Sequence, residues 1–220
     1  MRAFEDSYRH KGLRKKLIEQ VRAKGITDER VLEAMLSIPR HYFLDSAFDE
    51  VAYEDRAFPI AVGQTISQPY TVAYQTQLLQ VKPFEKILEI GTGSGYQCSV
   101  LAEMGAQVFT IERQKQLFDS LRKFALIRKY NNIKFFYGDG YEGLPTFAPF
   151  DKVLITAAAP VVPPRLIEQL KTGGKMVIPL GEYGKGSQTM MRLTRQADGS
   201  TTEEVFANFS FVEMKEGKDK

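Results

Sequence analysis

The sequence predicts an α/β protein with a doubly wound, mostly parallel sheet, an antiparallel C-terminal hairpin and an N-terminal helical extension. Three observations predict this fold. After Pro83, short apolar runs alternate with helical stretches, as in a parallel sheet with crossover helices. Before residue 58, apolar residues recur at helical spacing. Two late apolar runs follow each other without a helix between them, which favours an antiparallel pair at one sheet edge.

The N-terminal extension contains two predicted helices. Leu13, Leu17 and Val21 lie four residues apart and Gly25 follows, so a first amphipathic helix is expected to end there. Thr27 is the predicted N-cap of a second helix, which stops before Pro39. We expect residues 1–57 to form this extension.

A loop and a helix connect the extension to the predicted sheet. The segment FPIAVGQTISQP, residues 58–69, contains a glycine and two prolines and suits an extended loop better than a helix. Pro69 fits the first turn of the helix that follows. Residues 58–82 therefore form the second section of one domain that spans residues 1–220.

The predicted core covers residues 83–214, and a polar tail of residues 215–220 follows it. Five strands are expected in parallel, and the late hairpin adds two more. Their predicted ranges are residues 86–90, 107–111, 133–137, 152–156 and 175–180 for the parallel strands, and 188–195 and 204–214 for the hairpin.

Composition limits the partners of the protein. Its 220 residues, 43% of them hydrophobic and 26% charged, suffice for one full-sized domain without a membrane span or a visible secretory signal, so we expect a cytoplasmic monomer. The net charge of +3 is spread along the chain, which argues against a nucleic-acid partner. The single cysteine, Cys98, can form neither an internal disulfide nor a zinc cluster, so no metal is expected.

Three glycines follow the first predicted strand in KILEIGTGSGYQ. Gly91, Gly93 and Gly95 stand where a strand turns into a helix, and glycine there lets the backbone approach a ligand closely. Tyr96 occupies the position where a dinucleotide fingerprint has its third glycine, so pyrophosphate binding is disfavoured. The alternative is a glycine turn that serves only strand-to-helix packing.

Two further strand ends carry acids. Glu112 ends the second predicted strand 21 residues after Gly91, where a carboxylate can accept hydrogen bonds from both hydroxyls of a ribose. Asp139 follows the third strand and can accept from an adenine amino group, while Gly140 leaves room for the ring. Because parallel strands end at one edge of a sheet, these residues and the glycine turn predict an adenosine site.

These segments resemble the class I S-adenosylmethionine-dependent methyltransferases, which are Rossmann-like, and among them the protein-L-isoaspartate (D-aspartate) O-methyltransferases. The resemblance covers nearly the whole chain, and GQTISQP, FDKVLITAAAP and QLKTGG are specific to this family. The segments on which the resemblance rests are VGQTISQPYTVAYQTQLL, KILEIGTGSGYQCSVLAEMG, VFTIER, YGDGYEGLP and APFDKVLITAAAPVVPPRLIEQLKTGGKMVIPLG.

The resemblance implies a cofactor, a substrate and site residues. The cofactor is S-adenosyl-L-methionine, converted to S-adenosyl-L-homocysteine, and the substrates are isoaspartyl residues of damaged proteins and peptides, whose methyl ester is repaired through a succinimide. Gln64, Thr65, Ile66 and Ser67 are expected to border the cofactor and the reacting carboxylate, with Ser67 in the active-site role. Glu89 is also expected at the cofactor. The chain departs from the family in FVEM, where Glu213 stands in place of a proline that precedes the end of the peptide-binding strand.

The expected chemistry requires no general base. An α-carboxyl has a pKa of about 3.5, so the acceptor is already ionised at neutral pH. The only histidines, His10 and His41, lie outside the motifs and are interpreted as structural. Ser67 can orient the acceptor by a hydrogen bond, although without the family it is equally well interpreted as a cap of the next helix.

Two other functions compete with this interpretation. One keeps the cofactor and changes the acceptor to a nucleic acid or a small molecule. The residues after the fourth predicted strand, Thr156 and three alanines, do not resemble the DPPY or NPPY of amino-methylating enzymes. The other is a non-catalytic binding module with an adenosine pocket.

Overall fold

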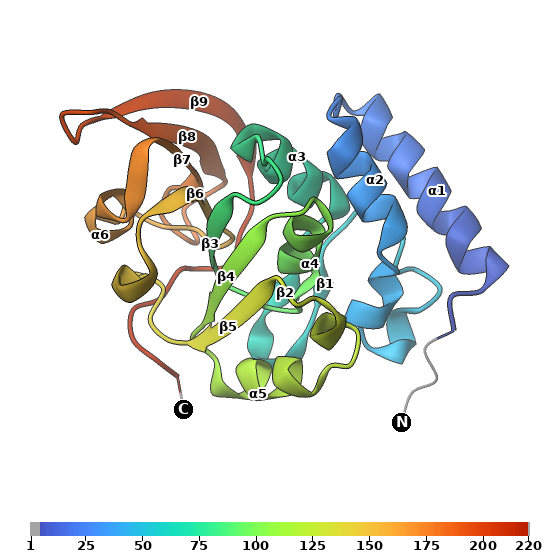
Figure 1. Ribbon diagram of the computed structural model, residues 1–220. Coiled ribbons are helices and arrows are strands. Elements are labelled where there is room, and N and C mark those ends of the chain that lie inside the picture. The colour runs from blue at the N-terminus through green and yellow to red at the C-terminus, as the bar shows by residue number, and fades with distance from the viewer. Residues whose placement is uncertain (1–4, 220) are drawn as a thin grey trace.

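The computed structural model describes residues 5–219 and confirms the predicted α/β architecture (Figure 1). The strands of the central sheet are β3 (Lys86–Ile90), β4 (Gln107–Glu112), β5 (Ile133–Tyr137), β6 (Phe150–Ile155), β7 (Leu170–Leu180), β8 (Gln188–Arg195) and β9 (Thr201–Phe209). Their order in the sheet is β5-β4-β3-β6-β7-β8-β9. The first five are parallel, and β8 and β9 extend the sheet in antiparallel fashion. The chain first adds strands on the β4 side of β3 and then continues with β6 on its other side. This change in the order of connection makes the junction of β3 and β6 a topological switch point, where sheets of this kind bind ligands.

The last strand differs from its prediction. The turn after β8 is short, with the Gln196 N–H donating to the Ser200 carbonyl, so β9 begins three residues earlier than expected and ends at Phe209. Residues 212–214 then leave the hairpin and pair with Ala158, whose N–H donates to the Val212 carbonyl at 2.7 Å. Residues 215–219 continue along the sheet edge instead of extending away from it. The pattern of apolar residues could not show that residues 204–214 divide into a strand that pairs with β8 and a segment that pairs with Ala158.

The helices flank the sheet, and short segments connect them (Figure 1). They are α1 (Tyr8–Ala23), α2 (Glu29–Ser37), α3 (Pro69–Leu79), α4 (Tyr96–Glu103), α5 (Lys115–Lys123) and α6 (Pro164–Glu168). Short 3-10 helices are η1 (Arg40–Phe43), η2 (Ser46–Phe48), η3 (Ala61–Gly63), η4 (Ile127–Lys129) and η5 (Pro145–Phe147), and a two-residue pair is made by β1 (Phe58–Pro59) and β2 (Thr65–Ile66).

Alternation along each buried strand builds two apolar layers. In β3, Ile87 packs with the buried residues of α1 to α4, whereas Leu88 and Ile90 pack on the opposite face with residues of β4, β6 and α6. This period of two follows from strand geometry, in which successive side chains point to opposite faces of the sheet. Glu89 follows Leu88 and therefore points to the helical side, where it is fully buried.

The cap of α2 is Asp28 rather than Thr27. The Asp28 carboxylate accepts a hydrogen bond from the Arg30 N–H at 3.0 Å. Thr27 instead contacts α3, because its backbone N–H donates to Gln77 Oε1 at 2.7 Å. Thr27 therefore helps to attach the N-terminal helices to the layer that covers the sheet.

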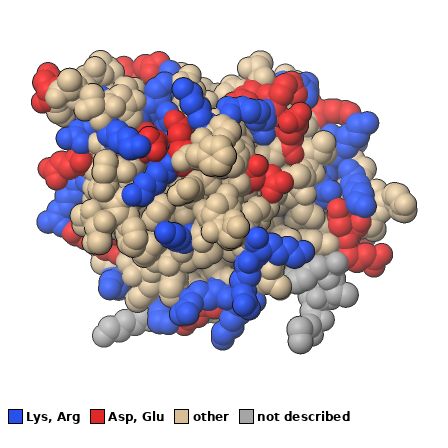
Figure 2. Space-filling view, viewed as in Figure 1, with Lys and Arg blue, Asp and Glu red and all other residues tan. Residues whose placement is uncertain are grey.

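Basic and acidic side chains are interspersed over most of the face shown in Figure 2, with a group of basic side chains along its lower edge. This surface agrees with the small net charge of +3. Within residues 5–219, no helix is both long and apolar enough to span a bilayer.

Candidate active site

A cavity of about 500 Å³ lies at the end of β3, β4 and β6. Its volume is in the range of pockets that hold small molecules and cofactors. Five segments contribute most of its walls: residues 62–67, 90–94, 111–114, 156–157 and 212–215. The structure thus brings together the predicted loop, the glycine turn and the acid at the end of β4, which are far apart in the chain.

The three glycines of the turn have different neighbours. All three have positive φ, +92° for Gly91, +55° for Gly93 and +84° for Gly95. A Cβ on Gly91 would meet Thr156 Oγ1 at 2.6 Å, and one on Gly95 would collide with Ile127. Only at Gly93 would a Cβ find ordinary contacts at 3.8 Å or more. Gly91 and Gly93 line the cavity, whereas Gly95 lies behind it and serves packing, so direct ligand contact by Gly95 does not fit this geometry.

Glu112 ties the end of β4 to the glycine turn. Its Oε2 accepts from the Gly93 N–H at 2.9 Å, and its Oε1 accepts from the Gln114 N–H at 2.8 Å. Burial raises the pKa of Glu112, and the backbone N–H donors oppose that rise. Glu112 lines the cavity, and each carboxylate oxygen retains a lone pair for a further donor, as the ribose assignment requires.

Asp139 and Gly140 differ in their position relative to the cavity. Gly140 lines the cavity, and a Cβ there would collide with Ile90, so only glycine fits. Asp139 is not a wall residue of the cavity. Its Oδ1 accepts from the Tyr141 N–H at 2.9 Å and its Oδ2 from the Gly217 N–H at 2.7 Å. The adenine contact predicted for Asp139 therefore has to share an oxygen that already bonds the C-terminal segment.

Glu89 lies beneath the cavity and does not line it, so the direct cofactor contact predicted for it does not fit the structure. The Thr110 hydroxyl donates to Glu89 Oε2 at 2.5 Å, and Thr110 also bonds Thr92 of the glycine turn. Glu89 Oε1 has no hydrogen-bond partner among the described residues. Complete burial raises the pKa of Glu89 to about 8. Glu89 thus supports the turn as a neutral acid.

This raised pKa predicts a pH dependence of stability. Glu89 stays protonated when folded and ionises when unfolded between pH 4.5 and about 8, so its stabilising contribution is present below pH 4.5 and is lost as pH rises through 8. Relative to Glu89→Gln, the wild type should lose about 1 kcal/mol of unfolding free energy between pH 6.5 and 7.5. Urea unfolding of both proteins at several pH values measures this difference.

The titration of His41 is common to the wild type and Glu89→Gln, so it cancels from the difference between them. Burial lowers the pKa of His41 to about 4, so its contribution changes between pH 4 and 6.5, with the opposite sign. Exposed Glu33→Gln is the matched control and should keep the wild-type slope. Parallel curves for wild type and Glu89→Gln would contradict a neutral Glu89.

The loop of residues 64–67 borders the cavity along its whole length, as predicted for Gln64, Thr65, Ile66 and Ser67. Ser67 is not the N-cap of α3, because the cap position is Gln68. The Asp55 carboxylate accepts the Tyr70 N–H at 2.8 Å and so satisfies the start of that helix. The alternative capping role for Ser67 is therefore taken by another residue.

Arg40 is a site-supporting residue that the sequence patterns do not indicate. It is completely buried and donates to the Ser67 carbonyl at 2.8 Å and to the Ala52 carbonyl at 3.2 Å. Its guanidinium lies 5.0 Å from the centre of the Tyr96 ring. Arg40 thus connects the N-terminal extension to two wall residues of the cavity, Ser67 in the loop and Tyr96 in α4. A lone Arg after Pro39 carries no sequence signal for this role.

Two further wall residues also lacked a specific signal. Thr156 Oγ1 donates toward the Ile90 and Gly91 carbonyls at 2.9 and 2.8 Å and so joins β6 to the glycine turn. Gln97 is buried at the cavity wall, and its Oε1 has no partner among the described residues. An unpaired buried acceptor is suited to a ligand that brings a donor.

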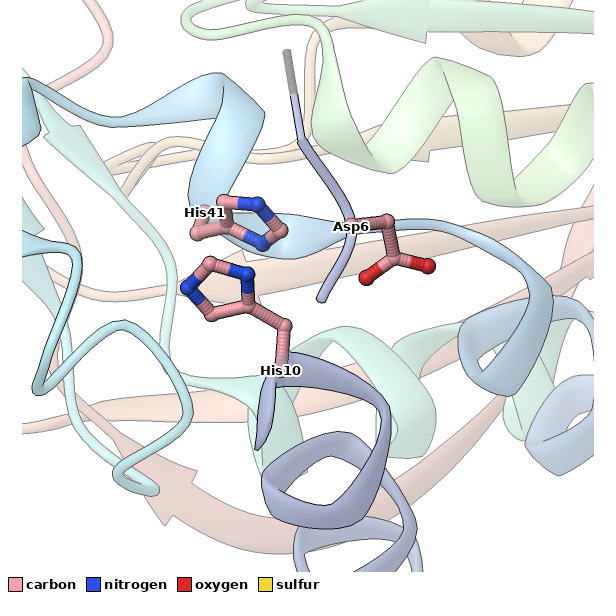
Figure 3. Close-up of side chains that lie close together, drawn as sticks. All are labelled: Asp6, His10 and His41. Atoms are coloured by element: carbon pink, nitrogen blue, oxygen red, sulfur yellow. The ribbon is translucent and has the colours of Figure 1, made fainter. Parts of the chain in front are cut away.

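The two histidines belong to the N-terminal layer, as expected of structural residues (Figure 3). Their rings stack with centroids 3.9 Å apart, and His41 Nδ1 bonds the Tyr53 hydroxyl at 2.7 Å. The neighbouring Asp6 carboxylate accepts both terminal nitrogens of Arg14, at 3.0 and 2.9 Å. Asp6, His10 and His41 place ligand-type atoms within 4.8 Å of one another, but the carboxylate is already neutralised by Arg14. Neither histidine lines the cavity.

Comparison with known proteins decides the family. The profile of protein-L-isoaspartate(D-aspartate) O-methyltransferases matches residues 12–219. The chain belongs to this family. A protein-L-isoaspartate O-methyltransferase of Cytophaga hutchinsonii is 57% identical over 216 residues, which are 98% of this chain and 96% of that protein. Another, from Flavobacterium johnsoniae, is 50% identical over 98% of this chain and its own full length.

Solved structures of the family agree with the fold. One protein-L-isoaspartate O-methyltransferase superposes with a TM-score of 0.82 at 25% identity, over 91% of this chain and 65% of that one. A second, from Plasmodium falciparum in complex with S-adenosyl-L-homocysteine, has a TM-score of 0.78 at 26% identity, over 92% of this chain and 98% of that one. The cofactor of this family is S-adenosylmethionine, and the cavity size, the open approach at Gly93, the Glu112 carboxylate and the unpaired Gln97 oxygen fit it.

Proposed function

We propose that the cavity holds S-adenosylmethionine beside the free α-carboxylate of an L-isoaspartyl residue, and that the protein methylates this carboxylate in damaged proteins and peptides. One observation supports the proposal: residues 64–67 line the same cavity as Gly91, Gly93, Glu112 and Gly140, four of the residues that we assign to the cofactor. Gly91, Gly93, Glu112 and Gly140 would hold the cofactor. Residues 64–67 form another part of the same wall, and we assign them to the acceptor.

The side chains present suit an acceptor that is already ionised. The cofactor supplies a methyl group on a positively charged sulfur. An α-carboxylate with a pKa of about 3.5 attacks without a base, and no histidine of the described residues lines the cavity. The remaining task is alignment in a site with little water, which contributes several kcal/mol when reacting atoms are well oriented.

Ser67 is the group that we assign to this alignment. Its hydroxyl can donate to one carboxylate oxygen and leave the other directed at the methyl group, and a neutral donor adds no charge that would repel the sulfonium. The Arg40 contact holds the backbone of Ser67 at 2.8 Å, and β2 pairs with β1 on the other side. The hydroxyl is therefore carried by a backbone that is fixed from both directions.

Ser67→Ala should lower kcat with little change in cofactor affinity. Loss of one hydrogen bond of about 0.5–1.5 kcal/mol corresponds to a decrease of about three- to tenfold. Steady-state kinetics with an isoaspartyl peptide and calorimetric titration with S-adenosylhomocysteine measure the two quantities. Ser187→Ala, in an exposed loop between β7 and β8, is the control and should match the wild type. An unchanged kcat would remove Ser67 from the alignment role.

The substrate assignment is tested by one assay. The protein receives labelled S-adenosylmethionine with an isoaspartyl peptide or with its aspartyl twin, and we expect a base-labile methyl ester on the first only. Methylation of an added nucleic acid or small molecule in place of the peptide would favour a different acceptor. Cofactor binding without methyl transfer to any acceptor would favour a binding module.

We also propose that the protein works as a monomer in the cytoplasm. The lone Cys98 is fully buried and desolvation raises its pKa well above its usual value, so it is a poor reactive thiol. Such cysteine usage is typical of a reducing compartment. Sedimentation of the purified protein at several concentrations measures the oligomeric state.

A further inference from the structure

The segment of residues 215–219, called the strap here, crosses the same end of the cavity that the adenosine residues form. Lys215 and Asp219 line the cavity together with Glu112, Arg113 and Gly140. Figure 1 shows the red C-terminal segment returning from the hairpin toward β5 and α5. The sequence predicted no role in the cavity for these five residues, which were expected to form a polar tail.

Hydrogen bonds to the backbone of the strap attach it to the ends of β4 and β5. The Asp219 N–H donates to the Arg113 carbonyl at 2.9 Å, and the Tyr137 hydroxyl donates to the Asp219 carbonyl at 2.7 Å. Arg113 Nε donates to the Gly217 carbonyl at 3.1 Å. The strap is therefore held at several points by residues that directly follow Glu112 or closely precede Asp139.

The root of the strap is also fixed. Met214 is buried in the second apolar layer, its N–H donates to the Ala158 carbonyl at 2.8 Å, and its carbonyl accepts from the Tyr141 hydroxyl at 3.2 Å. The strap thus begins from an anchored residue and is bonded again at Gly217 and Asp219. A segment held at both ends presents a defined wall rather than a fluctuating tail.

The bond between Gly217 and Asp139 attaches the strap to the turn after β5, and the next residue of that turn, Gly140, lines the cavity. Asp139 Oδ2 accepts the Gly217 N–H at 2.7 Å, and this carboxylate is the one assigned to the adenine amino group. A carboxylate oxygen accepts two hydrogen bonds, so Asp139 can keep the strap and take a second donor. The bond to Gly217 and the bond to the Tyr141 N–H together fix the Asp139 carboxylate, so the strap helps to hold the turn that presents Gly140 to the cavity.

We propose that the strap is the adenosine-side wall of the cofactor cavity and that cofactor affinity depends on it. This inference rests on the cofactor site proposed above. Removal of the strap takes away the wall residues Lys215 and Asp219 and opens the Arg113 and Gly140 side of the cavity to water, and it leaves the Asp139 carboxylate without one of its donors. Cofactor should then dissociate faster, because the contacts that close the cavity are lost.

The test compares the full chain with a chain ending at Met214, by calorimetric titration with S-adenosylhomocysteine and with adenosine. Binding of S-adenosylhomocysteine by the full chain is required by the cofactor site itself, and its absence would refute that site rather than the strap. Given such binding, the shortened chain should bind both ligands at least about fivefold more weakly. Equal or tighter binding would overturn the proposal, as would a loss for S-adenosylhomocysteine without a loss for adenosine.

A substitution keeps the test valid if the shortened chain does not fold. Gly217→Pro removes the N–H that bonds Asp139 and cannot adopt the native φ of +73°. It should weaken both ligands in the same direction while thermal unfolding shows a folded protein. Gly184→Pro is the matched control, since Gly184 also has positive φ, +80°, but lies in a loop that does not line the cavity. Unchanged affinity in a folded Gly217→Pro protein would overturn the proposal independently.

Discussion

Glu112→Gln should weaken the binding of S-adenosylmethionine by about tenfold or more. The change is nearly isosteric, but it removes the charge that strengthens hydrogen bonds to a ribose, which contribute about 1.5–3 kcal/mol each. It also replaces one of the two oxygens that accept the Gly93 and Gln114 N–H groups with a donor. The substitution therefore weakens both the hydrogen bonds that hold the glycine turn and those that would hold the ribose. Calorimetric titration with S-adenosylmethionine measures the dissociation constant.

Glu33→Gln is the control for this experiment. Glu33 lies exposed on α2 and carries the same charge without lining the cavity. Its substitution should leave the dissociation constant unchanged, which separates the local effect from the change in net charge. A dissociation constant for Glu112→Gln equal to that of the wild type would refute the ribose assignment.

Gly91→Ala should destabilise the protein by about 2 kcal/mol or more. The φ of +92° is strained for alanine, and the new Cβ would lie 2.6 Å from Thr156 Oγ1. Relief requires Thr156 to rotate, which breaks its bonds to the Ile90 and Gly91 carbonyls at 2.9 and 2.8 Å. Those bonds join β6 to the turn after β3. Urea unfolding measures the free energy.

Gly12→Ala provides the opposite sign within the same protein. Gly12 lies in α1, where a Cβ would meet nothing within 4 Å and the backbone is helical. Alanine there should stabilise the protein by about 0.5–1 kcal/mol. If Gly91→Ala unfolded at the wild-type urea concentration, the turn would be more compliant than its contacts indicate.

Local signals in the sequence determined the strand positions and the glycine turn. Short runs containing β-branched and aromatic or other apolar residues between turn residues mark strands, and β3, β5 and β8 coincide with their predicted ranges. A turn from strand to helix needs glycine wherever φ is positive, and Gly91, Gly93 and Gly95 all meet that condition. Parallel strands end at one edge, which is why the positions of Glu112 and Gly140 after their strands sufficed to place both at one site.

Tertiary structure alone decided which of these residues face the cavity and which segments enclose it. Whether Gly95 or Glu89 faces the cavity depends on packing against Ile127 and on the side of β3 that the helices cover, and neither is visible in a local pattern. Most hydrogen bonds of Arg40 and of the strap have a backbone carbonyl or N–H group as one partner, and nearly every residue possesses these groups. Such contacts leave no mark on residue type, so only the folded chain could assign them.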